Sequence, residues 1–590
     1  KAAGETVITA TCGTVKAECA VTVTPPVMAS AVTLDKTELN LYTGDTAALT
    51  AAIQPEDTTD PTIAWTTTDA EVASVQNGVV TAGKTGTATI TASCGEAKAQ
   101  CAVTVKAPAE PAQKDGVYQI GNADELVWFV KKVNGGENAI SAVLAKDIDL
   151  TDVIWTPIGN GSVAFAGSFD GAGHTVSNLT VDYATAASGE RLYLGLFGQV
   201  EGTPEKHAVI QNLTVTGSVN AASEFSVYSG YVAGVVGSAR NAELSKVISR
   251  VDVTADERVG STSSVGGLAG VMIDTTVTNC GNEGDVTGVN NLGGLCYELY
   301  SGTMTGCYNT GRIMATGTYV GGLMGYAKQA TITNAYSTGD VTTEKTLMGG
   351  LIGVMEKSAL TNAYTTGKVT TAAASGAIGA AVGSADQVSN VYYLGGASAI
   401  GDENATAKTA EELKALAPTL GSSFKENTGC GGYPLLVWQE ARAHQYENGV
   451  CTVCGAKDPA APYLLDGVTD AAAEVQTGKS YQLDDLMDGK IFGVKNGTLT
   501  YKNYFYTMSS DGGATWSGEQ HFEEAMFGGV NKSLVQSKAG TYIYKFRAKN
   551  DAGYSADTWT LMLTFVDVVE ANINFYVGRD QNYSTNGNKY

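Results

Sequence analysis

Basic side chains are scarce in this chain of 590 residues. Lysine and arginine total 37 against 60 aspartates and glutamates, which leaves a formal net charge of -23 at pH 7. Such a charge repels the phosphate backbone of nucleic acids, so we expect no nucleic-acid partner. The sequence also lacks an uninterrupted apolar run of about 18 residues, and we therefore expect no membrane insertion by this fragment.

Histidine is scarce as well, and the sequence contains no residue pattern typical of catalysis. The four histidines are His174, His207, His444 and His521. None of them belongs to a His-Glu-x-x-His motif, in which two imidazoles on one helix face hold the zinc of a peptidase. The sequence therefore predicts that this region is not an enzyme.

Glycine, in contrast, is abundant. The chain has 71 glycines, while only 16% of its residues are charged and 43% are hydrophobic. Tight turns and uncharged polar surfaces of this kind are typical of β-structure, and a chain of this length exceeds what one core serves. We expect an all-β protein of several domains, each with its own core.

Two stretches near the beginning repeat each other. Residues 4–23 and 86–105 align without a gap at an offset of 82 residues, which is the length of one domain. The complete copy, residues 29–106, alternates apolar and polar residues in short runs between turn signals, and this predicts a β-sandwich with Trp65 in its core. Residues 1–24 are expected to be the last strands of a truncated preceding copy.

The run from AVTLDKTELNLYTGD to GKTGTATITA within residues 29–106 resembles the bacterial group 2 Ig-like family. This resemblance implies an Ig-like β-sandwich and an extracellular setting, on a bacterial cell surface or in a secreted protein. The family is common in adhesins and as a spacer, so the resemblance names no ligand.

A linker at residues 107–114 precedes a second region, residues 115–438. Its first part, residues 122–134, has apolar residues at helical spacing and predicts a short helix that caps a β-stack. From residue 194 onward a Gly-rich motif recurs. Its later copies, VGGLAG, LGGLCY, VGGLMG, MGGLIG and IGAAVG, start at residues 265, 292, 320, 348 and 378.

A period of 27 to 30 residues with β-type alternation predicts a solenoid whose coils bury their apolar side against one another. The motif resembles the GLUG repeat of bacterial surface proteins. We expect a right-handed parallel β-helix with an N-terminal helical cap.

Four tyrosines occupy the same position of successive repeats: Tyr308, Tyr336, Tyr364 and Tyr392. If they face outward, they form an aromatic strip suited to stacking on sugar rings, and if inward, an internal ladder. Asp285, Arg312, Asp340 and Lys368 share another position, which predicts a ladder of alternating charges between coils. The sequence thus offers a candidate surface for an extracellular glycan or glycoprotein, with packing as the alternative.

The cysteines suggest two kinds of role. Cys12 and Cys19, like Cys94 and Cys101, are separated by seven residues across the last hairpin of an Ig-like copy, and we expect each pair to form a disulfide in an oxidising location. Cys280, Cys296 and Cys307 lie within the repeats, and we expect them to fill the solenoid interior unbridged.

Residues 439–460 contain a candidate metal site. The Cys451-x-x-Cys454-Gly turn presents two thiolates to one ion, and His444 is a third candidate ligand; this arrangement resembles a short His-Cys-Cys knuckle of bacterial surface proteins. Tetrahedral zinc needs a fourth ligand, for which Cys430 and Asp458 are candidates. The only cofactor suggested by the sequence is therefore a structural zinc, with a Cys451 to Cys454 disulfide or a vestigial loop as alternatives.

Residues 461–570 predict a second Ig-like sandwich, and residues 571–590 the start of a truncated further module. The run Ser509 to Trp516 resembles the Asp-box turn of sialidase propellers, but a single copy cannot build a propeller, and we expect it to close a hairpin.

Together these features predict a non-catalytic surface adhesin or scaffold that is monomeric. The alternatives are an accessory region of a larger secreted carbohydrate-active enzyme or peptidase, and a purely structural stalk.

Overall fold

The fold was analysed in a computed structural model that describes residues 3–567 except 183–190, 222–228, 257–262, 374–375 and short stretches between 399 and 552. The described chain is all-β apart from three short helices. It divides into two compact units: residues 1–426 with 434–439, and residues 427–433 with the chain from 440 onward. The predicted truncated module at 571–590 lies outside the described residues.

The first strands form a separate hairpin and a sandwich. The hairpin pairs β1 (Gly4–Cys12) with β2 (Val15–Val23). The sandwich has a sheet of order β4-β11-β10-β7 and two smaller sheets, β3-β6 and β5-β9-β8. Its strands are β3 (Ala31–Leu34), β4 (Glu38–Tyr42), β5 (Thr46–Ala48), β6 (Ala51–Gln54), β7 (Ala64–Thr67), β8 (Ala73–Gln76), β9 (Val79–Ala82), β10 (Gly86–Cys94) and β11 (Ala97–Lys106). Trp65 is half-buried and packs against both apolar clusters of this domain.

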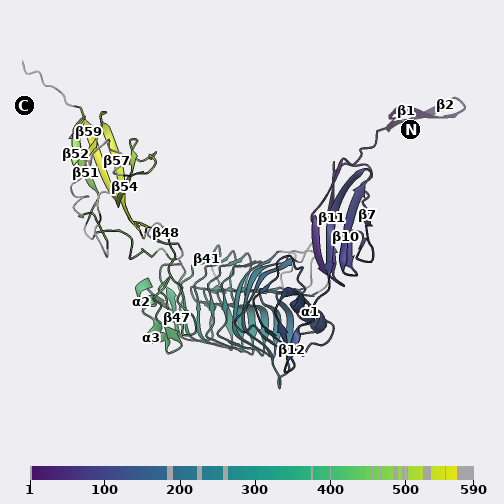
Figure 1. The fold of residues 1–590 in the computed structure, drawn as a ribbon, viewed down its shortest axis with the longest axis horizontal. Coiled ribbons are helices and arrows are strands. Elements are labelled where there is room, and N and C mark those ends of the chain that lie inside the picture. Colours follow the sequence, from purple (N-terminus) through teal and green to yellow (C-terminus); the bar gives the residue numbers. More distant parts are fainter. Residues whose placement is uncertain are drawn as a thin grey trace, which may run out of the picture. The chain divides into compact units, whose positions relative to one another are not determined.

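The predicted cap is a helix, α1 (Ala123–Asn134), as the sequence indicated. Asn122 caps its N-terminus by accepting a hydrogen bond from the Glu125 N–H. The face carrying Leu126, Phe129 and Val133 is buried in the core of the solenoid that follows. Figure 1 shows α1 at one end of the stack of coils.

The solenoid is a parallel β-helix with three faces. Its largest sheet has 20 strands, and the two others have seven each. The 20-stranded sheet contains β12 (Ala112–Lys114), β13 (Val117–Ile120), β14 (Ser141–Leu144), β15 (Ile148–Asp149), β16 (Ser168–Asp170), β17 (Thr175–Asp182), β20 (Ala208–Ala221), β23 (Ala242–Ala255), β26 (Thr276–Thr278), β27 (Gly281–Asn282), β28 (Val286–Gly288), β31 (Thr303–Thr305), β32 (Tyr308–Asn309), β33 (Ile313–Ala315), β36 (Thr331–Ser337), β37 (Val341–Thr343), β40 (Ala359–Thr365), β41 (Val369–Thr371), β44 (Gln387–Leu394) and β45 (Thr406–Lys408).

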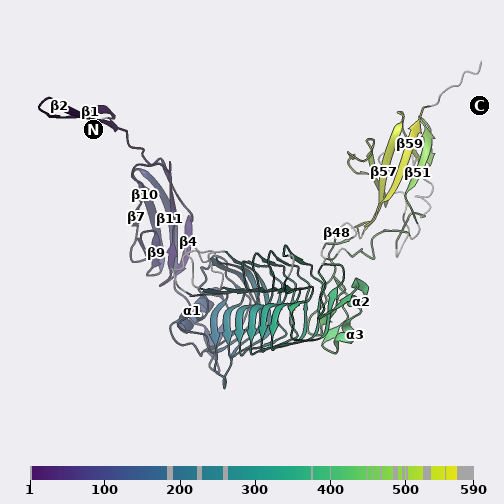
Figure 2. The ribbon, with the colours of Figure 1, turned by 180° about the vertical axis from the view of Figure 1, so that it is seen from behind.

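The two other faces have seven parallel strands each, and Figure 2 shows how strands stack side by side along the solenoid. One consists of β18 (Arg191–Leu194), β21 (Ser229–Ala233), β24 (Ser264–Gly266), β29 (Leu292–Gly293), β34 (Val320–Gly321), β38 (Met348–Gly349) and β42 (Ile378–Gly379). The other consists of β19 (Phe197–Glu201), β22 (Val236–Arg240), β25 (Ala269–Ile273), β30 (Cys296–Tyr300), β35 (Met324–Lys328), β39 (Ile352–Glu356) and β43 (Val382–Ser384).

The far end of the solenoid is closed by elements that the sequence did not reveal. The helices α2 (Ala410–Lys414) and α3 (Ala417–Leu420) follow the last coil, and Thr409 with Glu412 forms a capping box on α2. Leu413 and Leu420 are fully buried. Both ends of the β-stack are therefore covered by helices.

The repeated Gly-Gly pair is explained by the close approach of neighbouring coils. A Cβ atom on Gly294 would lie 2.1 Å from the Gly322 carbonyl oxygen, and one on Gly322 would lie 2.1 Å from that of Gly350. Both distances are far below van der Waals contact, so no side chain fits. The last copy has Ala380 at this position, where the regular repeats end.

The solenoid interior also contains the predicted cysteines. Cys280, Cys296 and Cys307 are fully buried and belong to the same apolar core. Cys280 and Cys307 stand in one column inside the coils with Ala335, Ala363 and Val391. These thiols act as small apolar side chains.

The charged residues predicted to form a ladder contact one another between neighbouring coils. The Arg312 guanidinium contacts the Asp285 carboxylate at 2.6 Å, and Asp285 also accepts the Arg312 N–H. The Asp340 carboxylate accepts the Lys368 N–H at 2.8 Å. The expected ladder therefore works partly through carboxylate-to-backbone bonds rather than through ion pairs alone.

The C-terminal domain is a second β-sandwich. Its main sheet has the order β51-β59-β57-β54-β55, with β58 paired to β57, and two small sheets pair β50 with β53 and β52 with β56. Its strands are β50 (Tyr463–Leu464), β51 (Ala471–Gln476), β52 (Ser480–Gln482), β53 (Phe492–Gly493), β54 (Tyr504–Ser509), β55 (Gln520–His521), β56 (Ser533–Val535), β57 (Gly540–Asn550), β58 (Gly553–Tyr554) and β59 (Trp559–Val566).

The Asp-box run forms the turn between β54 and β55, as expected. Asp511 accepts hydrogen bonds from the Thr515 hydroxyl and N–H, and the Ser509 hydroxyl donates to it at 2.7 Å. These bonds hold the pKa of the Asp511 carboxyl well below its ordinary value. Its carboxylate is therefore fully used in closing a hairpin.

We predict that Gly322→Ala destabilises the solenoid by about 3 kcal/mol, the upper end of the range for overpacking, because the new methyl group meets a backbone carbonyl of the next coil. Hydrogen-exchange mass spectrometry in denaturant measures this for the coil amides separately from the other domains. Gly401→Ala is the matched control, since a Cβ there meets nothing within 4 Å. Equal protection in the two variants would contradict the close-approach explanation.

Candidate functional site

The predicted tyrosine column exists and is stacked. The rings of Tyr308 and Tyr336 lie 5.5 Å apart with an interplanar angle of 17°, and those of Tyr336 and Tyr364 lie 5.1 Å apart at 9°. The preceding residue of each coil, such as Ala335, points into the solenoid core, while the ring itself is not part of that core. The column therefore lies on the outer side of the 20-stranded sheet.

The column is covered by the chain itself. Residues 434–439, which we call the covering segment, lie over it. The Tyr364 hydroxyl donates to the Pro434 carbonyl at 2.5 Å, the Tyr336 hydroxyl and the Gln439 side chain are hydrogen-bonded, and the Trp438 ring packs 5.8 Å from that of Tyr308. The Trp438 indole N–H donates to the Gly306 carbonyl. The rings face the covering segment rather than solvent.

This arrangement matches the packing alternative for three of the four tyrosines. Tyr308, Tyr336 and Tyr364 are 4%, 3% and 0% exposed, so their ring faces are closed to a sugar. Tyr392 is half-buried, and its hydroxyl donates to the Asn390 side chain. The tyrosines point outward, the orientation that the sequence linked to ligand binding, but they are buried.

We predict that Tyr364→Ala lowers the free energy of unfolding of the solenoid by about 3–5 kcal/mol, because it leaves a cavity under the covering segment. Tyr364→Phe removes only the hydrogen bond to Pro434 and is expected to cost about 1–2 kcal/mol. Denaturant-dependent hydrogen exchange of the coil containing β40 tests both. A Tyr364→Ala variant as stable as the parent would show that the column is not packing.

The expected disulfides of the Ig-like hairpins are wrong. Among the described residues, which include all ten cysteines, no disulfide is formed. In the first hairpin Cys12 lies opposite Val15 and Cys19 opposite Ile8, and in the second Cys94 lies opposite Ala97 and Cys101 opposite Ile90. The members of each pair are thus offset by four residues, or roughly 13 Å along a strand, beyond the reach of a disulfide.

The predicted metal ligands, in contrast, come together with one of the two candidate fourth residues. The ligand atoms of Cys430, His444, Cys451 and Cys454 all lie within 4.8 Å of one another. The Cys430 and Cys451 sulfurs are 3.5 Å apart, and Cys454 Sγ lies 3.4 Å from His444 Nδ1. Asp458 is not in this group; its carboxylate accepts the Ala460 N–H.

Local backbone structure positions each ligand of this Cys-His cluster. His444 precedes the hairpin of β48 (Tyr446–Glu447) and β49 (Val450–Cys451), in which Tyr446 lies opposite Cys451. The Cys451 N–H donates to the Ala456 carbonyl and closes the turn that carries Cys454. The Cys430 N–H donates to the Arg442 carbonyl and joins the segment before the covering segment to the one after it.

The pKa values of the cluster shift in different directions. Burial raises the pKa of the Cys454 thiol, but hydrogen bonds from Cys430 and from backbone N–H groups at Ala456 and Gly431 outweigh it and hold this pKa below its ordinary value. Burial and the neighbouring thiols raise the pKa of Cys430 to about 12. A hydrogen bond to Cys451 raises the pKa of His444. These side chains are placed to share protons or one cation.

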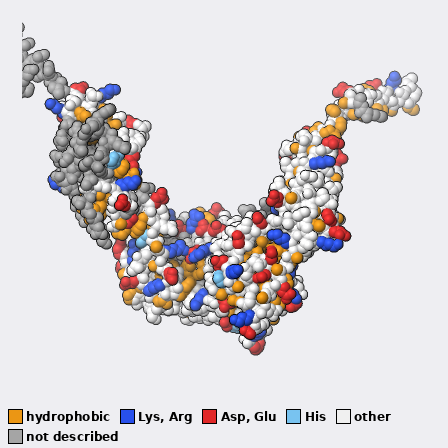
Figure 3. Space-filling model, in the orientation of Figure 1, with side chains coloured by type: hydrophobic (Ala, Val, Ile, Leu, Met, Phe, Trp, Pro, Cys, Tyr) orange, Lys and Arg blue, Asp and Glu red, His pale blue; other side chains and the backbone are white. Residues whose placement is uncertain are grey.

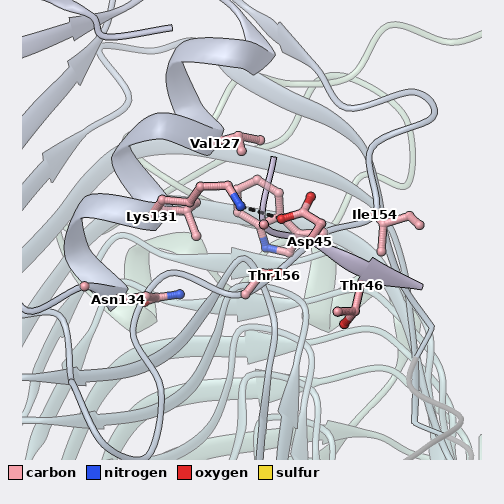
Figure 4. Close-up of a pocket in the computed structure, with 11 residues that line it drawn as sticks. Asp45, Thr46, Val127, Lys131, Asn134, Ile154 and Thr156 are labelled. Carbon is pink, nitrogen blue, oxygen red and sulfur yellow. Dashed lines mark hydrogen bonds and ion pairs between the residues drawn. The ribbon is translucent and has the colours of Figure 1, made fainter. Parts of the chain in front are cut away.

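A separate cleft of about 440 Å³ lies between β5 of the first sandwich and α1. In Figure 4 the Lys131 side chain of α1 points to the Asp45 carboxylate, and Ile154 lies on the side of Asp45 away from α1. Beside it the Tyr42 hydroxyl donates to Asp124 at 2.7 Å. The two charged groups that line this cleft, Lys131 and Asp45, are thus paired with each other.

The helices of the described chain are short. None combines the length and the apolar character needed to cross a membrane.

Two family patterns match the chain. The one described as bacterial Ig-like domain (group 2) matches residues 28–105, and the one described as the GLUG motif matches residues 316–342. An uncharacterised protein of Clostridium acetobutylicum is 31% identical over 136 residues, which are 22% of this chain and 13% of that protein. Halomucin of Haloquadratum walsbyi is 31% identical over 145 residues, which are 22% of this chain and 1% of halomucin.

The chain thus spans only a small part of the length of these relatives. Among solved structures, the S-layer protein rSbsC is 22% identical over 19% of this chain and 18% of its own, with a TM-score of 0.14. An IgA1 protease is 14% identical over 53% of this chain and 24% of its own, with a TM-score of 0.24. Similarities this low carry no argument about function. Residues 28–105 are a bacterial group 2 Ig-like domain, and the β-helix that follows carries the GLUG motif.

Proposed function

We propose that this region is a non-catalytic scaffold of a bacterial surface or secreted protein, in which the β-helix is a rigid spacer between Ig-like domains. The observation that carries this proposal is the covering of the tyrosine column by residues 434–439. An aromatic strip that binds ligands has to be accessible. Here the tyrosine rings instead hold residues 434–439, which follow the last coil of the solenoid, against the sheet. The column therefore serves the stability of the spacer.

A second observation supports rigidity at the other end of the solenoid. Tyr42 of the Ig-like domain is 7% exposed and belongs to the same apolar cluster as α1. Its hydroxyl bonds to Asp124, and Asp45 pairs with Lys131. Burial and the Asp124 carboxylate raise the pKa of Tyr42 well above its ordinary value, so the hydroxyl keeps its proton and its hydrogen bond throughout the neutral range.

We predict that Lys131→Glu loosens the junction between the Ig-like domain and the solenoid, because it places two carboxylates in the cleft. Small-angle X-ray scattering of the whole chain is expected to show a broader distribution of interatomic distances than the parent. Lys84→Glu is the control, since Lys84 pairs with Glu71 on the exposed surface of the same domain. Unchanged scattering of Lys131→Glu would remove this support for a rigid spacer.

A second candidate function, binding of an extracellular glycan or glycoprotein, rests on another part of the solenoid. On the outer face of β30 and β35, Lys328 lies 5.9 Å from the Tyr300 ring and 3.6 Å from Glu356, which also accepts the Tyr326 hydroxyl. Tyr300 and Tyr326 are half-buried. Aromatic rings beside paired charges suit a sugar. On the face drawn in Figure 3, acidic and basic side chains are interspersed.

A glycan array probed with the whole chain distinguishes the two candidates. The scaffold proposal predicts no reproducible signal, while adhesion predicts a signal that falls at least fivefold in Tyr326→Ala, on the basis of about 1 kcal/mol per stacking contact. Tyr463→Ala, at an exposed tyrosine of the C-terminal domain, is the control. Release of cleaved sugar by the parent chain would contradict both candidates.

A further inference from the structure

We propose that Cys430, His444, Cys451 and Cys454 bind one zinc ion, and that this metal fastens both flanks of the covering segment. The proposal goes beyond the scaffold function in two ways. It assigns a cofactor to this chain, and it makes the position of the covering segment on the tyrosine column dependent on bound metal. Three observations carry it: the convergence of the four ligand atoms, the backbone that holds them, and the place of the ligands in the sequence.

The distances fit a tetrahedral ion. With zinc-to-sulfur bonds of about 2.3 Å and zinc-to-nitrogen bonds of about 2.0–2.1 Å, two sulfurs lie roughly 3.8 Å apart and a sulfur and a nitrogen roughly 3.6 Å apart. The Cys430 and Cys451 sulfurs are 3.5 Å apart, and Cys454 Sγ is 3.4 Å from His444 Nδ1. A disulfide requires about 2.05 Å, so Cys430 and Cys451 are not bridged, and Cys454 is unbridged as well.

Turns and hydrogen bonds of the backbone hold the ligands in place. Gly431 has a φ of 90°, a conformation that disfavours any side chain, and this allows a turn directly after Cys430. The Cys451 N–H donates to the Ala456 carbonyl and closes the turn that carries Cys454, and the Cys430 N–H donates to the Arg442 carbonyl. Hydrogen bonds around a site hold its ligands in the orientation that a metal requires. On the opposite side, the His444 ring stacks on Tyr446 at 5.3 Å.

The ligand set selects the metal. Three thiolates and one imidazole are soft ligands that favour zinc over magnesium or calcium, which take oxygen ligands. Four protein ligands leave no open coordination position, which is typical of a structural site rather than a catalytic one. The ion would displace the protons of the thiols on binding.

The ligands lie on both sides of the covering segment in the sequence. Cys430 precedes the covering segment and His444 follows it, so one ion closes the chain between them into a loop. Closing this loop removes conformational freedom from the segment in its detached state. Metal binding is therefore expected to favour the bound position of residues 434–439 on the tyrosine column.

The first test is the metal content of the whole chain, purified under reducing conditions and reconstituted with zinc. Native mass spectrometry is expected to show one zinc per chain, and substitution with cobalt is expected to give the visible spectrum of a tetrahedral thiolate site. Cys454→Ser is expected to weaken zinc binding more than about 100-fold. Cys19→Ser, at another exposed cysteine, is the matched control and keeps full binding.

Two variants at His444 distinguish the loss of a metal ligand from a loss of folding. His444→Ala is expected to lose tight binding, while His444→Cys restores it by supplying a fourth thiolate. No bound zinc in the reconstituted parent, equal affinity of Cys454→Ser and Cys19→Ser, or a Cys430 to Cys451 disulfide under reducing conditions would overturn the site.

The second test concerns the covering segment. Hydrogen-exchange mass spectrometry of the parent with zinc, and again with a chelator, is expected to show faster exchange in the peptide containing residues 434–439 after metal removal. The peptide of β10 in the Ig-like domain serves as an internal control and is expected to be unchanged. Zinc binding without this change would overturn the fastening role while leaving the metal site and the scaffold proposal in place.

Discussion

The separation of about 4.8 Å between stacked β-coils is the constraint on which the rest of this structure depends. It brings identical positions of successive repeats into direct contact, so each position has to suit its own copy above and below. The Gly-Gly pair leaves room for carbonyl groups of the next coil, and the interior column accepts only small side chains. Contacts between coils therefore explain the repeated residues better than contacts with other molecules do.

The same constraint explains the polar columns. Asn282 donates to the Asn309 side chain at 2.8 Å, and Asn309 donates to the Ser337 hydroxyl, all of them fully buried. Burying an amide N–H without a partner would destabilise the solenoid, whereas here the amide N–H groups donate from one coil to the next. Polar residues in register therefore indicate stacking as readily as they indicate a binding surface.

A stack of coils has two ends and three flanks, and this chain covers several of them with its own residues. The helix α1 closes one end, and α2 with α3 closes the other. The tyrosine column on one flank is covered by residues 434–439. The proposed zinc site binds residues on both sides of that segment. The cysteines would therefore help to hold residues 434–439 on the tyrosine column.

Local patterns in the sequence determined the all-β class, the group 2 Ig-like domain, the solenoid with its helical cap, and the interior cysteines, because period, turn residues and coil register are properties of neighbouring residues. The hairpin register is also local: the two-residue turn at residues 13–14 places Cys12 opposite Val15, and this register excludes the predicted bond between Cys12 and Cys19.

Only the tertiary structure decided which outward-facing residues are covered and which distant residue completes a cluster. Gln439 meets Tyr336 across 103 residues, and Trp438 meets Gly306 across 132. Likewise, His444 and the Cys-x-x-Cys turn lie close in sequence. Whether Cys430 or Asp458 joins them as the fourth residue of the cluster depends on the path of the chain between Cys430 and His444. Such contacts depend on the path of the whole chain, and residue spacing within one segment carries no information about that path.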